Sequence, residues 1–303
     1  MQSFITFIQQ LEIPQDTQRL FHGRGGRYPQ SEHLCLDWFE PVLLITSFKL
    51  LEDSELEQIV NAIKQRWQQL TTQKPLNLVY QFRSGLGTET QLICGEVPES
   101  HIVTENGNQF NVHLLKGQNH GLFLDMRNGR QWVQQNAQGK KVLNLFAYTC
   151  GFSIAALAGG AESVVNIDMS KGALSIGKRN HNLNDFVGNA SFYGHDIFKS
   201  WGKLKKQGPY DLIIADPPSN QKGSFVATKD YVRLLRRLPE LMSEQCELLL
   251  CLNAPELTQT FLKQQVEEAM CDVTFVERIS NPLVYTDIDE EKSLKVFHYK
   301  RKG

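Results

Sequence analysis

Short apolar runs alternate with helix-like segments throughout the second half of the chain. Each run holds about four to seven mainly hydrophobic residues, and this alternation predicts strands joined by helices. We expect seven strands, at residues 142–146, 163–167, 190–193, 210–215, 247–252, 273–279 and 294–299. The order of elements indicates an α/β fold of the nucleotide-binding kind.

The first 115 residues follow a different pattern. Residues 41–45 predict a buried strand, and Ser54 and Glu57 predict a capping box that begins a helix. Three further strand-like runs follow, at 78–82, 91–97 and 110–115, and Asn106-Gly107 is typical of a hairpin turn. We therefore predict a small α+β domain at 1–115 and a larger α/β domain at 116–303.

The stretch from Lys140 to Ser170 runs in the order strand, turn, helix, strand and acid. The acid, Asp168, follows the turn by roughly 20 residues, where nucleotide-binding sheets place a carboxylate for a ribose hydroxyl. A dinucleotide site needs three glycines near the turn, and here only Gly151 is available. The pattern therefore excludes NAD and leaves two interpretations open: a pocket for S-adenosylmethionine, or an α/β turn without a ligand.

Composition narrows the class of protein. The chain has 303 residues, 41% of them hydrophobic, and a net charge of −1. Residues 1–115 hold 8 of the 32 Lys and Arg and 13 of the 33 Asp and Glu, which leaves 24 and 20 for the remainder. A nucleic acid would therefore have to be bound by the second part and by local basic patches.

Cysteine and histidine usage indicates a reducing compartment. None of the six cysteines forms a C-x-x-C pair, and the eight histidines show no metal spacing, so we expect free thiols and no metal site. The first residues lack the pattern of a signal peptide, and no apolar run approaches the roughly 18 residues of a membrane span. We expect a cytoplasmic protein that does not enter a membrane.

Two segments concentrate basic residues. Residues 22–28 place two arginines and a histidine among three glycines before Tyr28. This loop either contacts phosphates and stacks on a base or is a solvated surface loop. Residues 199–206 hold four lysines, and we expect a solvated helix face there rather than an RNA contact.

The run at 210–215 leads directly into Asp216-Pro217-Pro218-Ser219. Two prolines fix the backbone and remove two N–H groups, which leaves carbonyl oxygens at the strand end where α/β sheets bind ligands. Such acceptors suit the edge of a planar base removed from its stack. The loop after Ser219 carries Lys222, Gly223 and Phe225, and Phe225 is a candidate for stacking.

Three more acidic or basic side chains lie at the ends of apolar runs. Asp125 and Arg127 are candidates for the two charged ends of a methionine moiety. The competing interpretation is a structural ion pair, or an N-cap by which Asp125 begins a helix through Trp132. Asp196, followed by Ile197, is a candidate for the amino group of adenine.

Together these motifs resemble a class I S-adenosylmethionine-dependent methyltransferase. The segments GLFLDMR, NLFAYTCGFS, NIDMS, GHDIF and DPPS are similar to bacterial large-subunit ribosomal RNA methyltransferases that modify cytosine C5 or guanine N7. The resemblance covers residues from about 110 to 300. It implies a Rossmann-like catalytic domain with a mostly parallel seven-stranded sheet whose last strand is antiparallel. Residues 1–110 do not resemble the small RNA-binding module that often precedes this domain.

The resemblance also implies roles for individual residues. Asp168 would hold the ribose, Asp196 the adenine, and Asp125 and Arg127 the methionine end. The rest of the cofactor pocket would consist of Asn144, Phe146, Tyr148, Thr149, Gly151, Met169 and Ile197. The target base, in ribosomal RNA, would lie against Asp216, Pro217, Pro218, Ser219 and Asn253.

Methylation of carbon 5 of cytosine requires a cysteine nucleophile. Ser219, not cysteine, follows Asp-Pro-Pro, and Asn253 stands where the fifth strand would present the thiol. Cys251 lies one strand period earlier, deeper in the sheet. We therefore favour a nitrogen as the methylated atom. C5 methylation through Cys251, or a small-molecule or protein substrate, remains the alternative.

Overall fold

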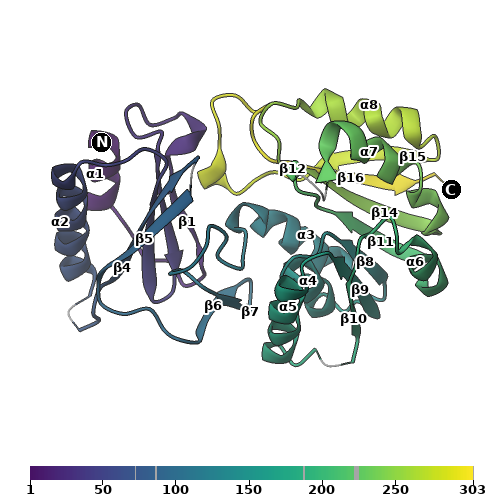
Figure 1. The fold of residues 1–303 in the computed structure, drawn as a ribbon, viewed down its shortest axis with the longest axis horizontal. Helices are drawn as coiled ribbons and strands as arrows, with labels where there is room; N and C mark the ends of the chain where they lie inside the picture. Colours follow the sequence, from purple (N-terminus) through teal and green to yellow (C-terminus); the bar gives the residue numbers. More distant parts are fainter. Residues whose placement is uncertain (72, 86, 187, 222–224, 303) are drawn as a thin grey trace. The chain divides into compact units, whose positions relative to one another are not determined.

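The computed structural model describes residues 1–71, 73–85, 87–186, 188–221 and 225–302. The chain divides into two compact units (Figure 1). The first comprises Met1–Asp125 and Pro282–Glu290, and the second comprises Met126–Asn281 and Glu291–Gly303. A segment close to the C-terminus thus belongs with the N-terminal unit. Among the described residues, no helix combines the length and hydrophobicity that crossing a membrane requires.

The first unit is built on a five-stranded sheet in the order β1-β2-β3-β4-β5, which is antiparallel except between β3 and β4. Its elements are α1 (Gln2–Gln9), β1 (Gln18–His22), η1 (Gly23–Gly25), β2 (Leu34–Phe39), β3 (Val42–Ser47), α2 (Asp53–Leu70), β4 (Asn77–Ser84), β5 (Gly87–Cys94), β6 (His101–Glu105), β7 (Asn108–Val112), η2 (Leu124–Met126) and η4 (Leu283–Tyr285). Between β6 and β7, Asn106 and Gly107 both have positive φ, of 50° and 79°, so the predicted hairpin turn is confirmed.

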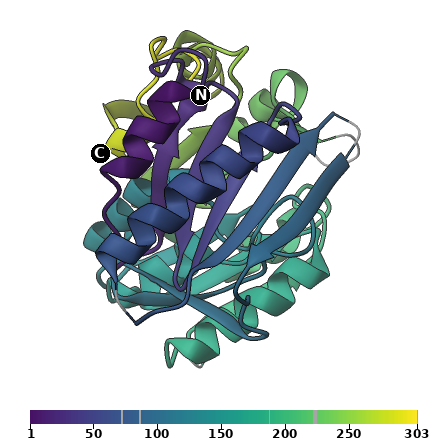
Figure 2. The same cartoon turned by 90° about the vertical axis from the view of Figure 1, so that its left-hand side faces the viewer.

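Helices α1 and α2 lie across one face of this sheet (Figure 2). Successive side chains of a strand face opposite ways, and Leu34, Leu36 and Trp38 of β2 all join the core beneath the helices. The predicted capping box is wrong by two residues: Glu52 is the N-cap of α2, and its N–H donates to Oε2 of Glu55 (3.0 Å). The N-cap residue of this helix therefore carries a carboxylate rather than the expected serine hydroxyl.

The basic loop at residues 22–28 is closely packed. A Cβ on Gly23 would lie 1.8 Å from the carbonyl oxygen of Ser31, so only glycine fits there. The ring of Tyr28 packs against that of Phe21, with centroids 4.5 Å apart. The structure therefore gives a compact loop with exposed arginines, and leaves open whether it contacts RNA.

The second unit holds a seven-stranded sheet in the order β10-β9-β8-β11-β14-β16-β15. Its strands are β8 (Lys141–Leu145), β9 (Ser163–Asp168), β10 (Ala190–Gly194), β11 (Tyr210–Ala215), β14 (Met242–Leu252), β15 (Val273–Arg278) and β16 (Lys295–Arg301). Only the last strand in the chain, β16, is antiparallel to its neighbours. The predicted fold, seven strands with an antiparallel last strand, is confirmed.

Helices cover both faces of this sheet. They are α3 (Arg127–Asn136), α4 (Gly151–Ala158), α5 (Lys171–Leu183), α6 (Trp201–Gln207), α7 (Ala227–Leu235) and α8 (Gln259–Ala269), with η3 (Leu238–Glu240) and the short strands β12 (Asn220–Gln221) and β13 (Phe225–Val226). Leu143 of β8 packs with the layer that holds α6, α7 and α8, whereas Val142 packs with α3 and α4. Burial on both faces explains why the strands appear in the sequence as continuous apolar runs.

Gly177 lets α5 approach the turn that follows β8. A Cβ at this position would lie 2.5 Å from Sγ of Cys150 and 3.3 Å from the carbonyl carbon of Thr149. We expect Gly177→Ala to lower the free energy of unfolding by about 1–3 kcal/mol, because backbone and a buried thiol must move. Gly172→Ala on the same helix meets nothing within 4 Å and should be neutral or stabilising by up to about 1 kcal/mol. Urea denaturation of both variants measures the difference; equal stabilities would contradict the close approach.

Candidate active site

The turn after β8 has an unusual backbone. Phe146, Tyr148 and Cys150 all have positive φ, of 58°, 47° and 65°, although none is glycine. Each such residue costs about 1–2 kcal/mol, and clusters of them are typical of functional sites. Two hydrogen bonds hold the turn: Ala147 N–H donates to the carbonyl of Ile167 (3.0 Å), and Cys150 N–H donates to that of Ala147 (2.7 Å).

Asp168, at the end of β9, connects this turn to the following helix. Its Oδ2 accepts a hydrogen bond from Tyr148 N–H (2.8 Å), and its Oδ1 accepts one from Ser170 N–H (2.7 Å). Each carboxylate oxygen can accept a second bond, so both retain capacity for a pair of ligand hydroxyls. The next side chain, Met169, is 49% exposed although apolar. A fixed acid beside an exposed apolar group fits a ribose and an adenine ring.

Asp196 follows β10, the strand next to β9. Gly194 pairs with Asp168 in the register of these strands, so Asp196 leaves the sheet at the same edge as Asp168. Its Oδ1 accepts the N–H of Lys199 (3.1 Å), and the carboxylate is thereby oriented by the backbone. Ile197 is buried with the core and supports this loop from below.

Asp216 and the two prolines follow β11, on the other side of β8 from β9. The hydroxyl of Ser219 donates to the carbonyl of Asn253, directly after β14. The predicted substrate residues Ser219 and Asn253 are therefore in contact. The parallel strands β9, β10 and β11 bring Asp168, Asp196 and Asp216 to one edge of the sheet, at their carboxyl ends, where α/β proteins bind ligands.

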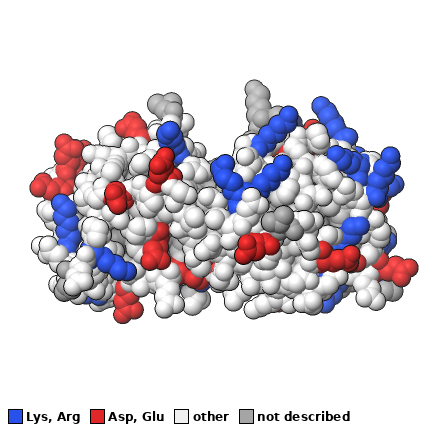
Figure 3. Space-filling view, turned by 90° about the horizontal axis from the view of Figure 1, so that it is seen from below, with Lys and Arg blue, Asp and Glu red and all other residues white. Residues whose placement is uncertain are grey.

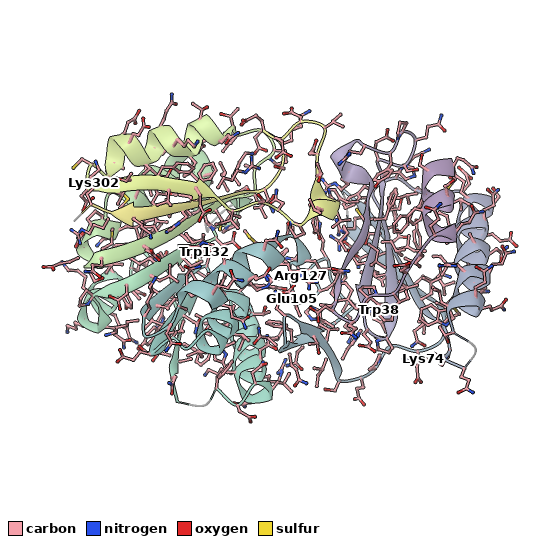
Figure 4. The ribbon with its side chains drawn as sticks, turned by 180° about the vertical axis from the view of Figure 1, so that it is seen from behind. Trp38, Lys74, Glu105, Arg127, Trp132 and Lys302 are labelled. Carbon is pink, nitrogen blue, oxygen red and sulfur yellow. The ribbon has the colours of Figure 1, made fainter. Side chains whose placement is uncertain are left out.

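Asp125 and Arg127 lie on either side of the N-cap of α3, Met126. Arg127 is the first residue of α3, which also carries Trp132 (Figure 4). Asp125 lies in η2 and does not begin a helix through Trp132: Met126 is the N-cap of α3, and the helix continues to Asn136. Asp125 belongs to the first unit, and its role at a methionine end stays a prediction.

Phe225 is not available for stacking on a base. It is 1% exposed, and its ring packs edge-on against Phe146, at 5.1 Å between centroids, and against Tyr231, at 5.7 Å. Phe225 therefore supports the turn after β8. Lys222 and Gly223 lie outside the described residues.

A chain of buried polar side chains lies behind the turn and was not predicted from the sequence. His181 Nδ1 is 2.7 Å from the carbonyl oxygen of Gly177, which can only accept, so Nδ1 carries the proton. Nε2 then accepts from Ser153 Oγ (2.8 Å), which in turn accepts from Asn166 Nδ2 (3.0 Å). Asn166 Oδ1 accepts from Asn144 Nδ2 (2.9 Å). The sequence feature that could have indicated this buried chain is the presence of polar residues inside apolar runs.

Two predicted pocket residues are consequently enclosed. The side chain of Asn144 is 1% exposed within this hydrogen-bonded chain, and Thr149 is 2% exposed. Neither side chain is open to a ligand. Asn144 instead joins β8 to β9, opposite Asn166 in the strand register.

Burial makes the Cys150 thiol unreactive. Burial, reinforced by the nearby carboxylate of Asp168, raises the pKa of the Cys150 thiol well above its ordinary value. Cys150 is therefore a neutral structural group. Throughout the described part of the chain, no three His, Cys, Asp or Glu residues are grouped to hold a metal ion.

Burial lowers the pKa of His181 below its ordinary value. The unfolded chain then takes up a proton first as the pH falls below about 6.5, so stability is lost on acidification. We expect His181→Gln to remove up to about 2 kcal/mol of the loss between pH 7 and pH 5. The exposed His195→Gln serves as control, and urea denaturation at both pH values provides the measurement. An unchanged pH dependence in His181→Gln would rule out the neutral buried imidazole.

The comparisons with known proteins agree with this geometry. A family model described as S-adenosylmethionine-dependent methyltransferase matches residues 18–300. "Ribosomal RNA large subunit methyltransferase I" of Yersinia pseudotuberculosis is 30% identical over 273 residues, covering 86% of this chain and 67% of the relative. The protein of that name from Aeromonas salmonicida is 34% identical over 188 residues, covering 61% of this chain and 48% of the relative. The match thus spans from about half to two thirds of these relatives.

Solved structures lead to the same family. A methyltransferase from Streptococcus mutans is 28% identical, with a TM-score of 0.85, over 98% of this chain and 80% of that one. A methyltransferase solved with SAH superposes with the same TM-score at 27% identity, over 98% of this chain and 80% of that one. The predicted resemblance is confirmed, together with S-adenosylmethionine as the cofactor of the family. The chain belongs to the family of S-adenosylmethionine-dependent methyltransferases.

Proposed function

We propose that this chain methylates a base of large-subunit ribosomal RNA and that the methylated atom is a nitrogen. The observation that carries the proposal is the arrangement of Asp168, Asp196 and Asp216 at the carboxyl ends of neighbouring parallel strands. Two of these acids suit an adenosine, and the third opens a proline-stiffened edge that suits a planar base. The names of the relatives support ribosomal RNA as the substrate.

The cofactor is held by groups that the backbone already orients. Asp168 accepts hydrogen bonds from the ribose hydroxyls with its remaining lone pairs, and Asp196 accepts a hydrogen bond from the amino group of adenine. Met169 covers the ring, while Tyr148 and Gly151 shape the pocket beneath the methionine arm. Arg127, at the start of α3, binds the carboxylate of that arm. Fixed acceptors lose little freedom on binding, which favours affinity.

The reaction is an in-line displacement. When bound, S-adenosylmethionine supplies an electrophilic methyl group: the base nitrogen forms the new N–C bond as the C–S bond breaks and sulfur keeps the electron pair. The carbonyl oxygens around Asp216, Pro217 and Pro218 hold the base, and the Ser219 to Asn253 contact fixes that edge. The proton on nitrogen leaves to water afterwards. Alignment supplies most of the acceleration.

The surroundings of the cysteines favour nitrogen over carbon 5. Cys251 is 0% exposed in β14, and its carbonyl accepts the hydroxyl of Tyr231 (2.7 Å) from the covering helix. Cys150 is equally buried and neutral. Among the residues that the structure describes, no cysteine is exposed at the carboxyl ends of β8, β9, β10, β11 or β14, and the exposed Cys271 follows α8. A base carbon therefore lacks the thiolate that it would need.

The proposal is tested by transfer of labelled methyl groups to unmodified large-subunit ribosomal RNA. We expect transfer by the wild type, and an SAH affinity about 10–100-fold weaker in Asp168→Asn, because an amide NH2 replaces one of the two acceptor oxygens and cannot accept from a backbone N–H or from the ribose. Calorimetry measures the affinity. The matched control is Asp185→Asn, an exposed acid with positive φ that asparagine also adopts. No transfer to RNA, with transfer to protein or small molecules, would refute the proposed substrate.

We expect Cys251→Ser to keep the transfer rate within about threefold of the wild type, because the thiol takes no part in the chemistry. Denaturing gel electrophoresis with a 5-fluorocytidine-containing RNA should show no covalent adduct. Its control is Cys246→Ser, another buried thiol of β14. Loss of transfer in Cys251→Ser alone, accompanied by an adduct on the wild type, would establish C5 methylation instead.

A further inference from the structure

Helix α7 begins at the candidate substrate edge. The N–H of Ala227, its first residue, donates to the carbonyl of Ser219 (3.0 Å), and Asp230 accepts the N–H of Val226 (2.8 Å) to fix the start of the helix. Lys229 and Arg233 follow four residues apart, so they lie on one side of the helix, and Arg236 and Arg237 come directly after its last residue, Leu235. The Cα atoms of Lys229 and Arg233 are therefore about 6 Å apart along the helix axis, at 1.5 Å per residue.

The basic side chains of this region rest on aromatic rings of β10, of the segment before α6 and of α6 itself. Arg233 lies 3.9 Å from the ring centroid of Phe198, and Arg237 lies 4.4 Å from that of Trp201. Lys203 of α6 lies 3.8 Å from the ring of Tyr193. Stacking of this kind fixes the direction of a flexible cationic side chain while its N–H groups stay available.

Little negative charge neutralises these groups. Glu240 pairs with Lys205 (3.0 Å) and with Arg237 (3.7 Å). Within the described chain, no carboxylate pairs with the other cations of the region. We call this set the basic-aromatic surface: Lys199, Lys203, Lys206, Lys229, Arg233 and Arg236, all exposed. In Figure 3, Lys and Arg side chains gather over the second unit, at the right.

We propose that the basic-aromatic surface binds the phosphates of the RNA strand whose base lies at Asp216–Ser219. The proposal rests on the proposed function. An RNA strand requires regularly placed cations beside the bound base, and α7 supplies them from the residue at which the substrate loop ends. Arginine guanidinium groups suit phosphate oxygens bidentately. The proposal departs from the expectation that residues 199–206 form only a solvated face, because Lys205 pairs with Glu240 and Arg237 stacks on Trp201.

The opposite arrangement on α8 provides a control. Lys263 also stacks on an aromatic ring, 4.3 Å from the centroid of Phe275. It lies on a helix that carries Glu267 and Glu268 and that begins at Gln259, after the candidate substrate residue Asn253. A neutral residue at Lys263 therefore removes the same kind of stacked cation without touching the basic-aromatic surface.

The experiment measures binding to an unmodified large-subunit ribosomal RNA transcript between 50 and 200 mM KCl. The variant replaces Lys203, Arg233 and Arg236 with glutamine and leaves Arg237 and its ion pair intact. Each lost phosphate contact lowers the slope of log K against log [salt] by about 0.7 for single strands, so the slope should fall by about 2. Affinity should fall roughly tenfold, with SAH affinity unchanged. Lys263→Gln should match the wild type.

The outcomes separate this inference from the proposed function. A wild type that neither binds nor methylates the RNA overturns the proposed function. A wild type with a steep slope that the triple glutamine variant retains overturns the basic-aromatic surface alone. If the triple variant loses SAH affinity because it misfolds, the same measurement is made on the charge-preserving set Lys203→Arg, Arg233→Lys and Arg236→Lys. Recovery of the wild-type slope by that set supports the surface, and a slope that stays low refutes it.

Discussion

The carboxylate of Asp168 holds the turn after β8 in a conformation that its own residues do not favour. Three non-glycine residues with positive φ together cost several kcal/mol. A hydrogen bond from Tyr148 N–H to an ionised oxygen offsets part of that cost, because charge-assisted bonds are stronger than neutral ones. The acid proposed to hold the ribose also shapes the turn beneath the cofactor. The proposed binding of the ribose would therefore be coupled to the fold of the turn.

The interior behind this turn is also polar. Asn144 and Asn166 face each other across β8 and β9, and Ser153 and His181 extend the hydrogen-bonded chain to α4 and α5. Each donor in this chain meets an acceptor, so the chain favours one register and one helix position. Apolar side chains in this space would stabilise the fold more but would constrain the position of the turn less.

The sequence predicted the sheet well and the pocket less well. Strands buried on both faces appear as continuous apolar runs, so all seven could be located, and the acids at their ends followed. The sequence does not show which way a polar side chain points. Asn144 was therefore expected in the pocket although it lies behind it, and Phe225 was expected to face a base although it packs on Phe146. α1 was missed because eight residues carry too short a periodicity.

Chain continuity connects the two halves of the proposed substrate site. The loop that presents carbonyl oxygens to a base ends at the residue where α7 begins, and a main-chain hydrogen bond between Ala227 and Ser219 joins them. A strand bound along α7 would therefore place its base at a distance set by one rigid helix rather than by flexible side chains. Displacement at the methyl carbon of the cofactor requires such precision, because misplacement of the base by about 1 Å costs on the order of a hundredfold in rate. A main-chain link of this kind suits the proposed reaction, which relies on alignment rather than on a nucleophilic cysteine.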